Sequence, residues 1–110
     1  MTKLSPLEEK TLTAFKEKLQ KHFGDQVISL RLFGSRAMGK GDEYSDLDVL
    51  VLVRQWDWKM KREIFDLAWE CYWDHDIDIS PLVLSEKEYE ELKGLERNIA
   101  KDIEAYGMPL

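Results

Sequence analysis

Three aspartates and a glycine–serine turn carry the residue types that could do chemistry in this sequence. Gly34 and Ser35 follow an apolar segment, Asp46 and Asp48 open the next one, and Asp78 lies within a third. Alternate residues of a strand share a face, so we expect the side chains of Asp46 and Asp48 to lie about 7 Å apart on one face. An apolar strand with two such carboxylates is costly to fold unless a cation sits on them. The pattern predicts a metal-dependent nucleotidyl-transfer site.

The three carboxylates suit the two Mg²⁺ ions of such a reaction, in which an acceptor hydroxyl attacks the α-phosphate of a nucleoside triphosphate. Mg²⁺ prefers oxygen ligands and keeps some waters and substrate phosphates in its shell. We expect Asp46 and Asp48 to hold the nucleotide-bound ion and to share the second ion. Asp78 is expected to complete the shell of the second ion and to accept the proton of the acceptor, directly or through water.

The turn beside the carboxylates suits a phosphate. Gly34 lets the backbone approach a phosphate closely, and the N–H groups of Gly34 and Ser35 can form an anion-binding concavity. The Ser35 hydroxyl adds a donor and Arg36 a cation, with Lys40 as a weaker candidate for the same role. The alternative is that the aspartates are solvated turn residues, because short motifs recur by chance. The coincidence of a turn, paired carboxylates and a third carboxylate favours the metal site.

The elements that must position these residues can be read from hydrophobic spacing and capping signals. Helices are expected between Ser5 and Gly24 and over 57–73, 85–93 and 95–106, with a helical turn near 35–38. Strands are expected over 27–33, 47–53 and 76–84, and Pro81 places the third of these at a sheet edge or near its own end. In the first strand, Ile28, Leu30 and Leu32 should share one face.

The connections between these elements predict the topology. The short link between the first two strands favours an antiparallel pair, whereas the strand–helix–strand unit over 46–84 favours a parallel pair with a right-handed crossover. Residues 47–53 are apolar throughout, which indicates a central strand covered on both faces. We predict an α+β fold, described as a two-layer α/β arrangement, with a small mixed β-sheet flanked by helices. At 110 residues the chain is expected to form a single domain over 1–110.

Composition and charge narrow the class of protein. The net charge is −6, with 8 Lys and Arg against 4 Asp and Glu in residues 1–40, and 8 against 18 in residues 41–110. Stable nucleic-acid binding is disfavoured, because such affinity comes largely from neutralising phosphates. No apolar run approaches the length of a membrane span. The single Cys71 cannot form an internal disulfide, which favours a buried structural thiol and a reducing cytoplasm.

The helix expected over 57–73 offers a possible partner surface. One apolar stripe comprises Met60, Ile64, Leu67, Ala68 and Cys71, and a second, aromatic one comprises Trp58, Phe65, Trp69, Tyr72 and Trp73. Their combined arc is wider than a surface helix needs, and interface cores are rich in aromatic residues. We hypothesise that part of Trp56, Trp58, Trp69 and Trp73 contacts a partner or a second copy. The alternative is that the terminal helices cover the second stripe.

The motifs resemble those of a known family. Residues 33–39 (FGSRAMG), 45–51 (SDLDVLV) and 77–79 (IDI) are similar to the motifs of the minimal nucleotidyltransferase (MNT) group of the DNA polymerase β-like superfamily. The resemblance covers residues 27–105 and implies the nucleotidyltransferase fold. Met38 departs from the arginine of many relatives, which removes one phosphate-facing cation. All three carboxylates are present, so the resemblance implies an active enzyme.

The resemblance also implies a partner and an acceptor. Such small proteins are often paired with a HEPN-domain toxin, and the chain would be the cytoplasmic antitoxin in a hetero-oligomer with it. It would move AMP from ATP to a tyrosine hydroxyl of the HEPN ribonuclease. One alternative is a binding-only antitoxin that masks its partner sterically. Another is nucleotidylation of a small molecule such as an aminoglycoside, which the lack of an acceptor-gripping domain disfavours.

Overall fold

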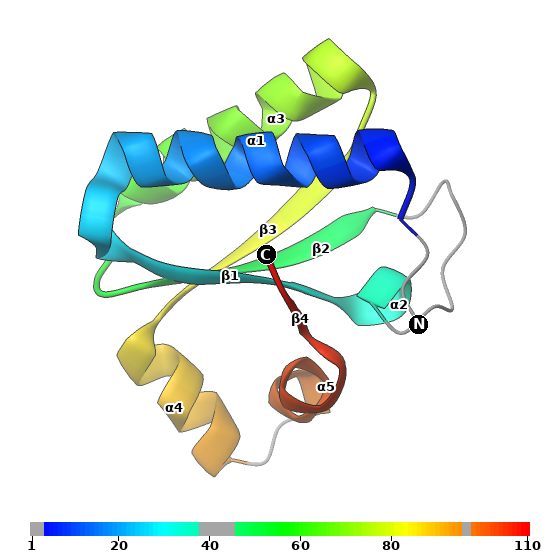
Figure 1. The fold of residues 1–110 in the computed structure, drawn as a ribbon. Helices are drawn as coiled ribbons and strands as arrows, with labels where there is room; N and C mark the ends of the chain where they lie inside the picture. Colours follow the sequence, from blue (N-terminus) through cyan, green and yellow to red (C-terminus); the bar gives the residue numbers. More distant parts are fainter. Residues whose placement is uncertain (1–3, 38–45, 96–97) are drawn as a thin grey trace.

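A four-stranded mixed sheet forms the centre of the protein (Figure 1). The computed structural model describes residues 4–37, 46–95 and 98–110. In these residues the strands are β1 (Val27–Phe33), β2 (Leu47–Val53), β3 (Ile79–Ser85) and β4 (Met108–Pro109), in the spatial order β3-β2-β1-β4. β2 is antiparallel to β1 and parallel to β3, which confirms both predicted pairings. Pro81 lies in β3, an edge strand, as its missing N–H requires.

Helices cover both faces of the sheet. They are α1 (Pro6–Phe23), α2 (Gly34–Ala37), α3 (Trp58–His75), α4 (Glu86–Gly94) and α5 (Asn98–Tyr106), with a 3₁₀ turn, η1 (Gly24–Gln26), after α1. Figure 1 shows α1 and α3 on one face and α4 and α5 on the other. The α+β class is confirmed. Two layers in all were expected, the sheet and one layer of helices, whereas the structure has three, with a layer of helices on each face of the sheet. No helix in the described ranges is both long and apolar enough to cross a membrane.

The strand β2 explains why helices cover both faces of the sheet, because its side chains are buried on both faces. Val49 and Val51 belong to one core cluster together with residues of α1 and α3. Leu50 belongs to a second cluster, with Tyr89 of α4 and Ile103 of α5. Successive strand residues point to opposite faces, so a strand that is apolar throughout needs cover on both sides.

Capping boxes begin α1 and α4 where the sequence predicts them. Ser5 Oγ accepts from the N–H of Glu8 at 3.1 Å, and Glu8 Oε1 accepts from the N–H of Ser5 at 2.8 Å. Ser85 and Glu88 repeat the arrangement at α4. The reciprocal bonds satisfy N–H groups that a helix terminus otherwise leaves unpaired.

The register of β1 differs from the prediction. A β-bulge lies between Val27 and Ser29, so Val27 joins Leu30 and Leu32 in the buried core and Ile28 is exposed. A bulge adds one residue to one strand, which reverses the alternation of faces at that point. The expectation that Ile28 shares one face with Leu30 and Leu32 is therefore wrong.

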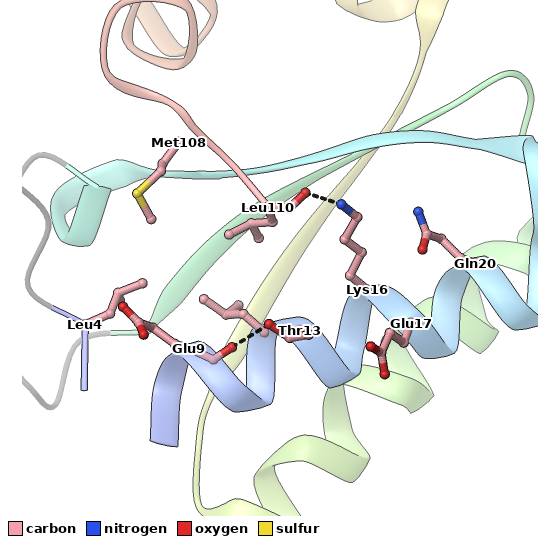
Figure 2. Close-up of a pocket in the computed structure, with 9 residues that line it drawn as sticks. Leu4, Glu9, Thr13, Lys16, Glu17, Gln20, Met108 and Leu110 are labelled. Atoms are coloured by element: carbon pink, nitrogen blue, oxygen red, sulfur yellow. Dashed lines mark hydrogen bonds between the residues drawn. The ribbon is translucent and has the colours of Figure 1, made fainter. Parts of the chain in front are cut away.

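The short strand β4 was not expected from the sequence. It pairs antiparallel with β1 opposite Arg31 and Leu32, and the N–H of Leu110 donates to the carbonyl oxygen of Leu30 at 3.0 Å. Lys16 Nζ of α1 donates to the carbonyl oxygen of Leu110. Between α1 and this strand lies a pocket of about 480 Å³ (Figure 2). Two residues are too few to show an alternating pattern, which is why no sequence signal marks β4.

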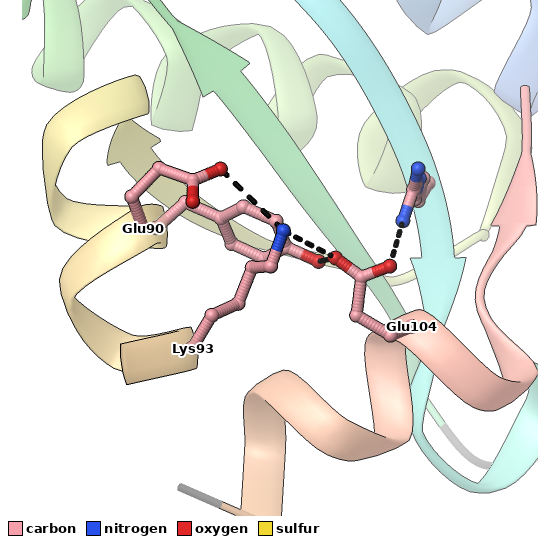
Figure 3. A network of polar contacts seen from close by, with 5 residues as sticks. Glu90, Lys93 and Glu104 are labelled. Carbon is pink, nitrogen blue, oxygen red and sulfur yellow. Dashed lines mark hydrogen bonds and ion pairs between the residues drawn. The ribbon is translucent and has the colours of Figure 1, made fainter. Parts of the chain in front are cut away.

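A polar network joins α4 and α5 to β1. Tyr89 Oη donates to Glu104 Oε1 at 2.9 Å, and the carboxylate of Glu104 also pairs with Lys93 Nζ at 3.3 Å and Arg31 Nη1 at 3.8 Å (Figure 3). Burial, and then the hydrogen bond to Glu104, raise the pKa of Tyr89 to about 12. The same hydrogen bond lowers the pKa of Glu104 and outweighs desolvation. The network therefore fixes α5 on the sheet through one ionised carboxylate.

Removing the Tyr89 hydroxyl tests this network. Tyr89→Phe should lower the free energy of unfolding by about 1 kcal/mol at neutral pH, because it removes a hydrogen bond to a partly exposed carboxylate. The lowered pKa of Glu104 means that this contribution is present above its ordinary value of 4.5 and is lost as the pH falls through the folded-state value. Urea denaturation at a series of pH values measures both effects. Tyr106→Phe, at an exposed tyrosine of α5, is the matched control, and an equal loss there would contradict the assignment.

Candidate active site

The three aspartates lie at one end of the sheet. Asp46 immediately precedes β2, Asp48 is the second residue of that strand, and Asp78 immediately precedes β3, whereas the sequence placed it inside the strand. The N–H of Leu47 donates to the carbonyl oxygen of Asp78 at 2.9 Å, and Leu47 is in register with Ile79. Because β2 and β3 are parallel, both strands begin at the same sheet end. The structure therefore brings Asp46 and Asp78 side by side.

Two of the three carboxylates have raised pKa values, and Asp46 contributes to both shifts. Burial raises the pKa of Asp48, and the charge of Asp46 raises it further. Burial also raises the pKa of Asp78, followed by the charge of Asp46 and a side-chain hydrogen bond with it. Asp46 is thus the common neighbour of the other two. Such a group of carboxylates attracts a cation, since a cation relieves the repulsion that raises the pKa values.

Gly34 lies directly against the carboxylate of Asp48. Its φ is +77°, and a Cβ built on its backbone would overlap Oδ2 of Asp48 and lie 3.1 Å from Cγ. Phe33, the preceding residue, pairs with Asp48 across β1 and β2. Only glycine tolerates both the positive φ and this close approach. The contact places the turn after β1 beside the acidic end of β2.

Arg36 lies inside the protein. Its Nη2 donates to Oε1 of Glu8 at 2.6 Å, and its side chain is only 4% exposed. Burial raises the pKa of Glu8, but the hydrogen bond from Arg36, the bonds from Ser5 and the charge of Arg36 together lower it. The pair joins α2 to the first turn of α1. No local sequence signal shows that the oxygen of Glu8 that caps α1, Oε1, also accepts from a residue far along the chain.

The structure describes the other residues near the predicted phosphate site only in part. Ser35 is the second residue of α2, and its side chain lies outside the described part of the structure. Lys40 and Met38 also lie outside the described residues. The pocket of Figure 2 is separate from this region, because α1 and the C-terminal residues line it and none of the three aspartates does. The carboxylates therefore lie at the end of the sheet, outside that pocket.

The carboxylates fit a magnesium ion by their chemistry. Within residues 4–37, 46–95 and 98–110, no group of three or more acidic, histidine or cysteine side chains forms a metal cluster. Mg²⁺ does not require one, because it is usually held by one or two carboxylates together with waters and substrate phosphates. Asp46 with Asp48, and Asp46 with Asp78, supply two pairs of hard oxygen donors.

The contact between Gly34 and Asp48 can be tested by a double-mutant cycle. Gly34→Ala should lower the free energy of unfolding by about 1–3 kcal/mol, because the added Cβ is strained at positive φ and overlaps the carboxylate. Part of this loss should disappear in an Asp48→Ala background, where the overlap is gone but the strain remains. Gly24→Ala is the control, since its φ is +59° with nothing within 4 Å of the added Cβ. A Gly34→Ala cost that Asp48→Ala leaves unchanged would contradict the contact.

The repulsion around Asp46 predicts a gain of stability from its removal. The raised pKa values of Asp48 and Asp78 mean that their contribution is fully present below their ordinary value of 3.8 and is lost as the pH rises through the folded-state values. Asp46→Asn reduces that loss, so its Tm in metal-free buffer should exceed that of the wild type at pH 7. The gain should vanish near pH 3. Asp102→Asn on α5 removes the same charge at an exposed site, and an equal gain there would indicate general charge relief instead.

Two curated relatives are similar in sequence, both from Methanocaldococcus jannaschii. "Putative protein adenylyltransferase MJ1305" is 34% identical over 80 residues, which are 70% of this chain and 54% of that protein. The chain thus spans about half the length of that relative. "Putative protein adenylyltransferase MJ0141" is 33% identical over 95 residues, which are 86% of this chain and 89% of that protein.

Solved structures share the fold. A mutant of the MntA–HpeT toxin–antitoxin superposes with a TM-score of 0.57 at 20% identity, over 98% of this chain and 72% of that chain. A nucleotidyltransferase structure from Sulfolobus solfataricus gives a TM-score of 0.54 at 21% identity, over 83% of this chain and 84% of that chain. These likenesses confirm the predicted nucleotidyltransferase fold.

The sequence profile of the nucleotidyltransferase domain family matches residues 9–106, a range that runs from α1 to the end of α5. It includes the turn at Gly34 and all three aspartates. The predicted family and the predicted enzyme class are both confirmed. The chain therefore belongs to the nucleotidyltransferase domain family and is an enzyme of that type.

Proposed function

We propose that this nucleotidyltransferase moves AMP from ATP to a hydroxyl group of a partner protein. The observation that carries the proposal is the position of Asp46 between Asp48 and Asp78, at the sheet end that Gly34 reaches. The names of the two relatives, both protein adenylyltransferases, support ATP as the donor and a protein as the acceptor. The fold alone would allow many other substrates.

In the proposed reaction, Asp46 and Asp48 would hold a Mg²⁺ ion, and Asp78 would share a second ion with them. Bound Mg²⁺ would neutralise the charge of the triphosphate and lower the pKa of the attacking hydroxyl. A bound cation would stabilise the carboxylates as well as the substrate, because each carboxylate lies near another negative charge. Their ionised forms are stabilised once a cation is present.

Asp78 is also suited to take the proton of the acceptor. It is exposed, so an acceptor hydroxyl can reach its carboxylate, and it lies beside Asp46 at the same end of the sheet. The acceptor oxygen forms a bond to the α-phosphorus, the bond from that phosphorus to the bridging oxygen breaks, and pyrophosphate leaves. The hydroxyl proton passes to Asp78, directly or through water.

The turn from Gly34 to Arg36 is proposed to hold the phosphates. The backbone of Gly34 approaches without a Cβ, and Ser35 follows it. Arg36 is paired with Glu8, so we assign it the added task of fixing the turn against α1. Lys40 remains the proposed second cation for the triphosphate.

The acceptor we propose is a tyrosine of a HEPN ribonuclease toxin, with this chain as its cytoplasmic antitoxin. The likeness to the MntA–HpeT toxin–antitoxin supports a toxin partner. The net charge of −6 disfavours RNA or DNA as the acceptor, because nucleic-acid affinity comes largely from cations that neutralise phosphates.

Replacing Asp78 separates transfer from binding. With ATP, Mg²⁺ and the toxin encoded beside this chain, mass spectrometry should show the toxin shifted by whole AMP units. Asp78→Asn should reduce the rate at least about 100-fold, because it removes the proton acceptor, while ATP binding by calorimetry persists. Asp76→Asn is the matched control, since it removes a charge two residues away and asparagine suits the left-handed conformation there, with φ of +56°.

Other outcomes distinguish the remaining functions. An Asp46→Asn, Asp48→Asn variant that still neutralises the toxin would show a binding-only antitoxin. AMP adducts on aminoglycosides, with none on the toxin, would show a small-molecule enzyme. Transfer that survives removal of Mg²⁺ by EDTA would contradict the assigned metal role of the carboxylates.

A further inference from the structure

The outer face of α3 exposes a row of aromatic side chains. Trp58, Trp69 and Trp73 are 75%, 57% and 70% exposed, and Phe65 and Tyr72 lie between them along the same face at 44% and 38%. We call these five residues the aromatic stripe. The sheet covers the other side of the helix, where Ile64, Ala68 and Cys71 are buried, so the stripe points away from the core. Residues three and four apart on a helix are neighbours, so the last four of these side chains form a continuous row, and Trp58 lies on the same face two turns before Phe65.

Trp56 does not belong to this surface. It is partly buried, packs against the main core and donates its Nε1–H to Glu88 Oε1 at 2.6 Å. The hypothesis that Trp56 contacts a partner is therefore not supported by its position. The hypothesis of a partner contact therefore rests on Trp58, Trp69 and Trp73.

Three rings of the stripe contact one another, and the stripe is large enough for a specific contact. Trp69 stacks on Tyr72 with ring centroids 5.3 Å apart and meets Trp73 edge-on at 6.0 Å. At the exposed fractions above, the five side chains offer roughly 400–700 Å² of aromatic surface per chain. Two such surfaces reach the lower range of specific interfaces, about 1,200 Å² in total.

The charges along α3 are divided between its two ends. Its first five residues include Lys59, Lys61 and Arg62 and no acid. The remainder, up to residue 74, carries acids alone, namely Glu63, Asp66, Glu70 and Asp74.

Some of these charges are already engaged within the chain. Glu63 pairs with His22, Glu70 pairs with Lys18, and Lys61 lies over the ring of Trp56. Within the described residues, no ion pair forms at Lys59, Arg62, Asp66 or Asp74. Arg62 comes four residues after Trp58 and Asp66 three residues before Trp69, so these two charges lie beside the aromatic stripe.

We propose that the aromatic stripe binds a second copy of this chain, with the two α3 helices antiparallel across a two-fold axis near Phe65 and Asp66. An antiparallel arrangement places the basic end of each helix beside the acidic end of the other. Arg62 then lies beside Asp66 and Trp69 of the partner subunit, and Trp58 lies beside Trp73 of the partner subunit. A two-fold interface needs a surface that complements itself, and α3 supplies both halves. A parallel arrangement would set like charges against each other.

Measuring the mass of the purified protein against concentration tests the proposal. Light scattering should give twice the chain mass at high concentration and the single-chain mass on dilution, with a blue shift of tryptophan fluorescence on association. Trp69→Ser combined with Trp73→Ser should weaken association at least about tenfold, since buried tryptophans dominate such interfaces. Tyr106→Ser, at an exposed aromatic residue on α5, should leave it unchanged. Circular dichroism verifies that each variant is folded.

A charge exchange tests the antiparallel arrangement separately. Arg62→Glu and Asp66→Arg should each weaken association, because each sets like charges face to face, whereas the two together should restore it. A single-chain mass at every concentration would overturn the proposal and leave the stripe to a different protein. Undiminished association of the tryptophan variant, or a double exchange that fails to restore it, would overturn it as well.

Discussion

The concentration of negative charge at one end of the sheet is the constraint on which the rest of the structure depends. Burial raises the pKa values of Asp48 and Asp78 and the charge of Asp46 raises them further, so the ionised state that can bind a cation is the state that the folded chain disfavours. Two hydrophobic clusters, one on each face of β2, offset this cost. Carboxylates that repel one another need a rigid support to stay together, and a strand buried on both faces provides one.

A second constraint runs from α1 to the turn beside that site. Oε1 of Glu8 accepts both the N–H of Ser5, which begins α1, and Nη2 of Arg36 in α2. The same carboxylate therefore sets where α1 starts and where the turn after β1 lies. Since Gly34 contacts Asp48 and Arg36 contacts Glu8, the turn is held from both sides. A buried ion pair of this kind is costly to break, because either partner alone would be left charged and unpaired.

Local chemistry explains what could be predicted from the sequence. The capping box at Ser5, the apolar run of β2 and the length of the crossover are each visible within a short window, and they give the helix start, the central strand and the parallel pair correctly. The bulge at Val27, the pairing of Met108 with Leu32 and the inward direction of Arg36 depend on contacts between distant segments. No spacing rule contains those contacts. The acidic residues were found because their types are informative, although the sequence set Asp78 inside β3.

Helix α3 has two apolar surfaces, and only one of them packs against the sheet. The sheet covers Ile64, Ala68 and Cys71, which leaves the larger aromatic side chains outside. Burying the aromatic stripe instead would enclose more apolar area, but it would also bury Arg62 and Asp66, which lie on the same side of the helix. The charges therefore decide the direction of the helix, and the exposed tryptophans follow from that decision. Their exposure leaves an apolar surface whose flanking charges match those of a second antiparallel helix.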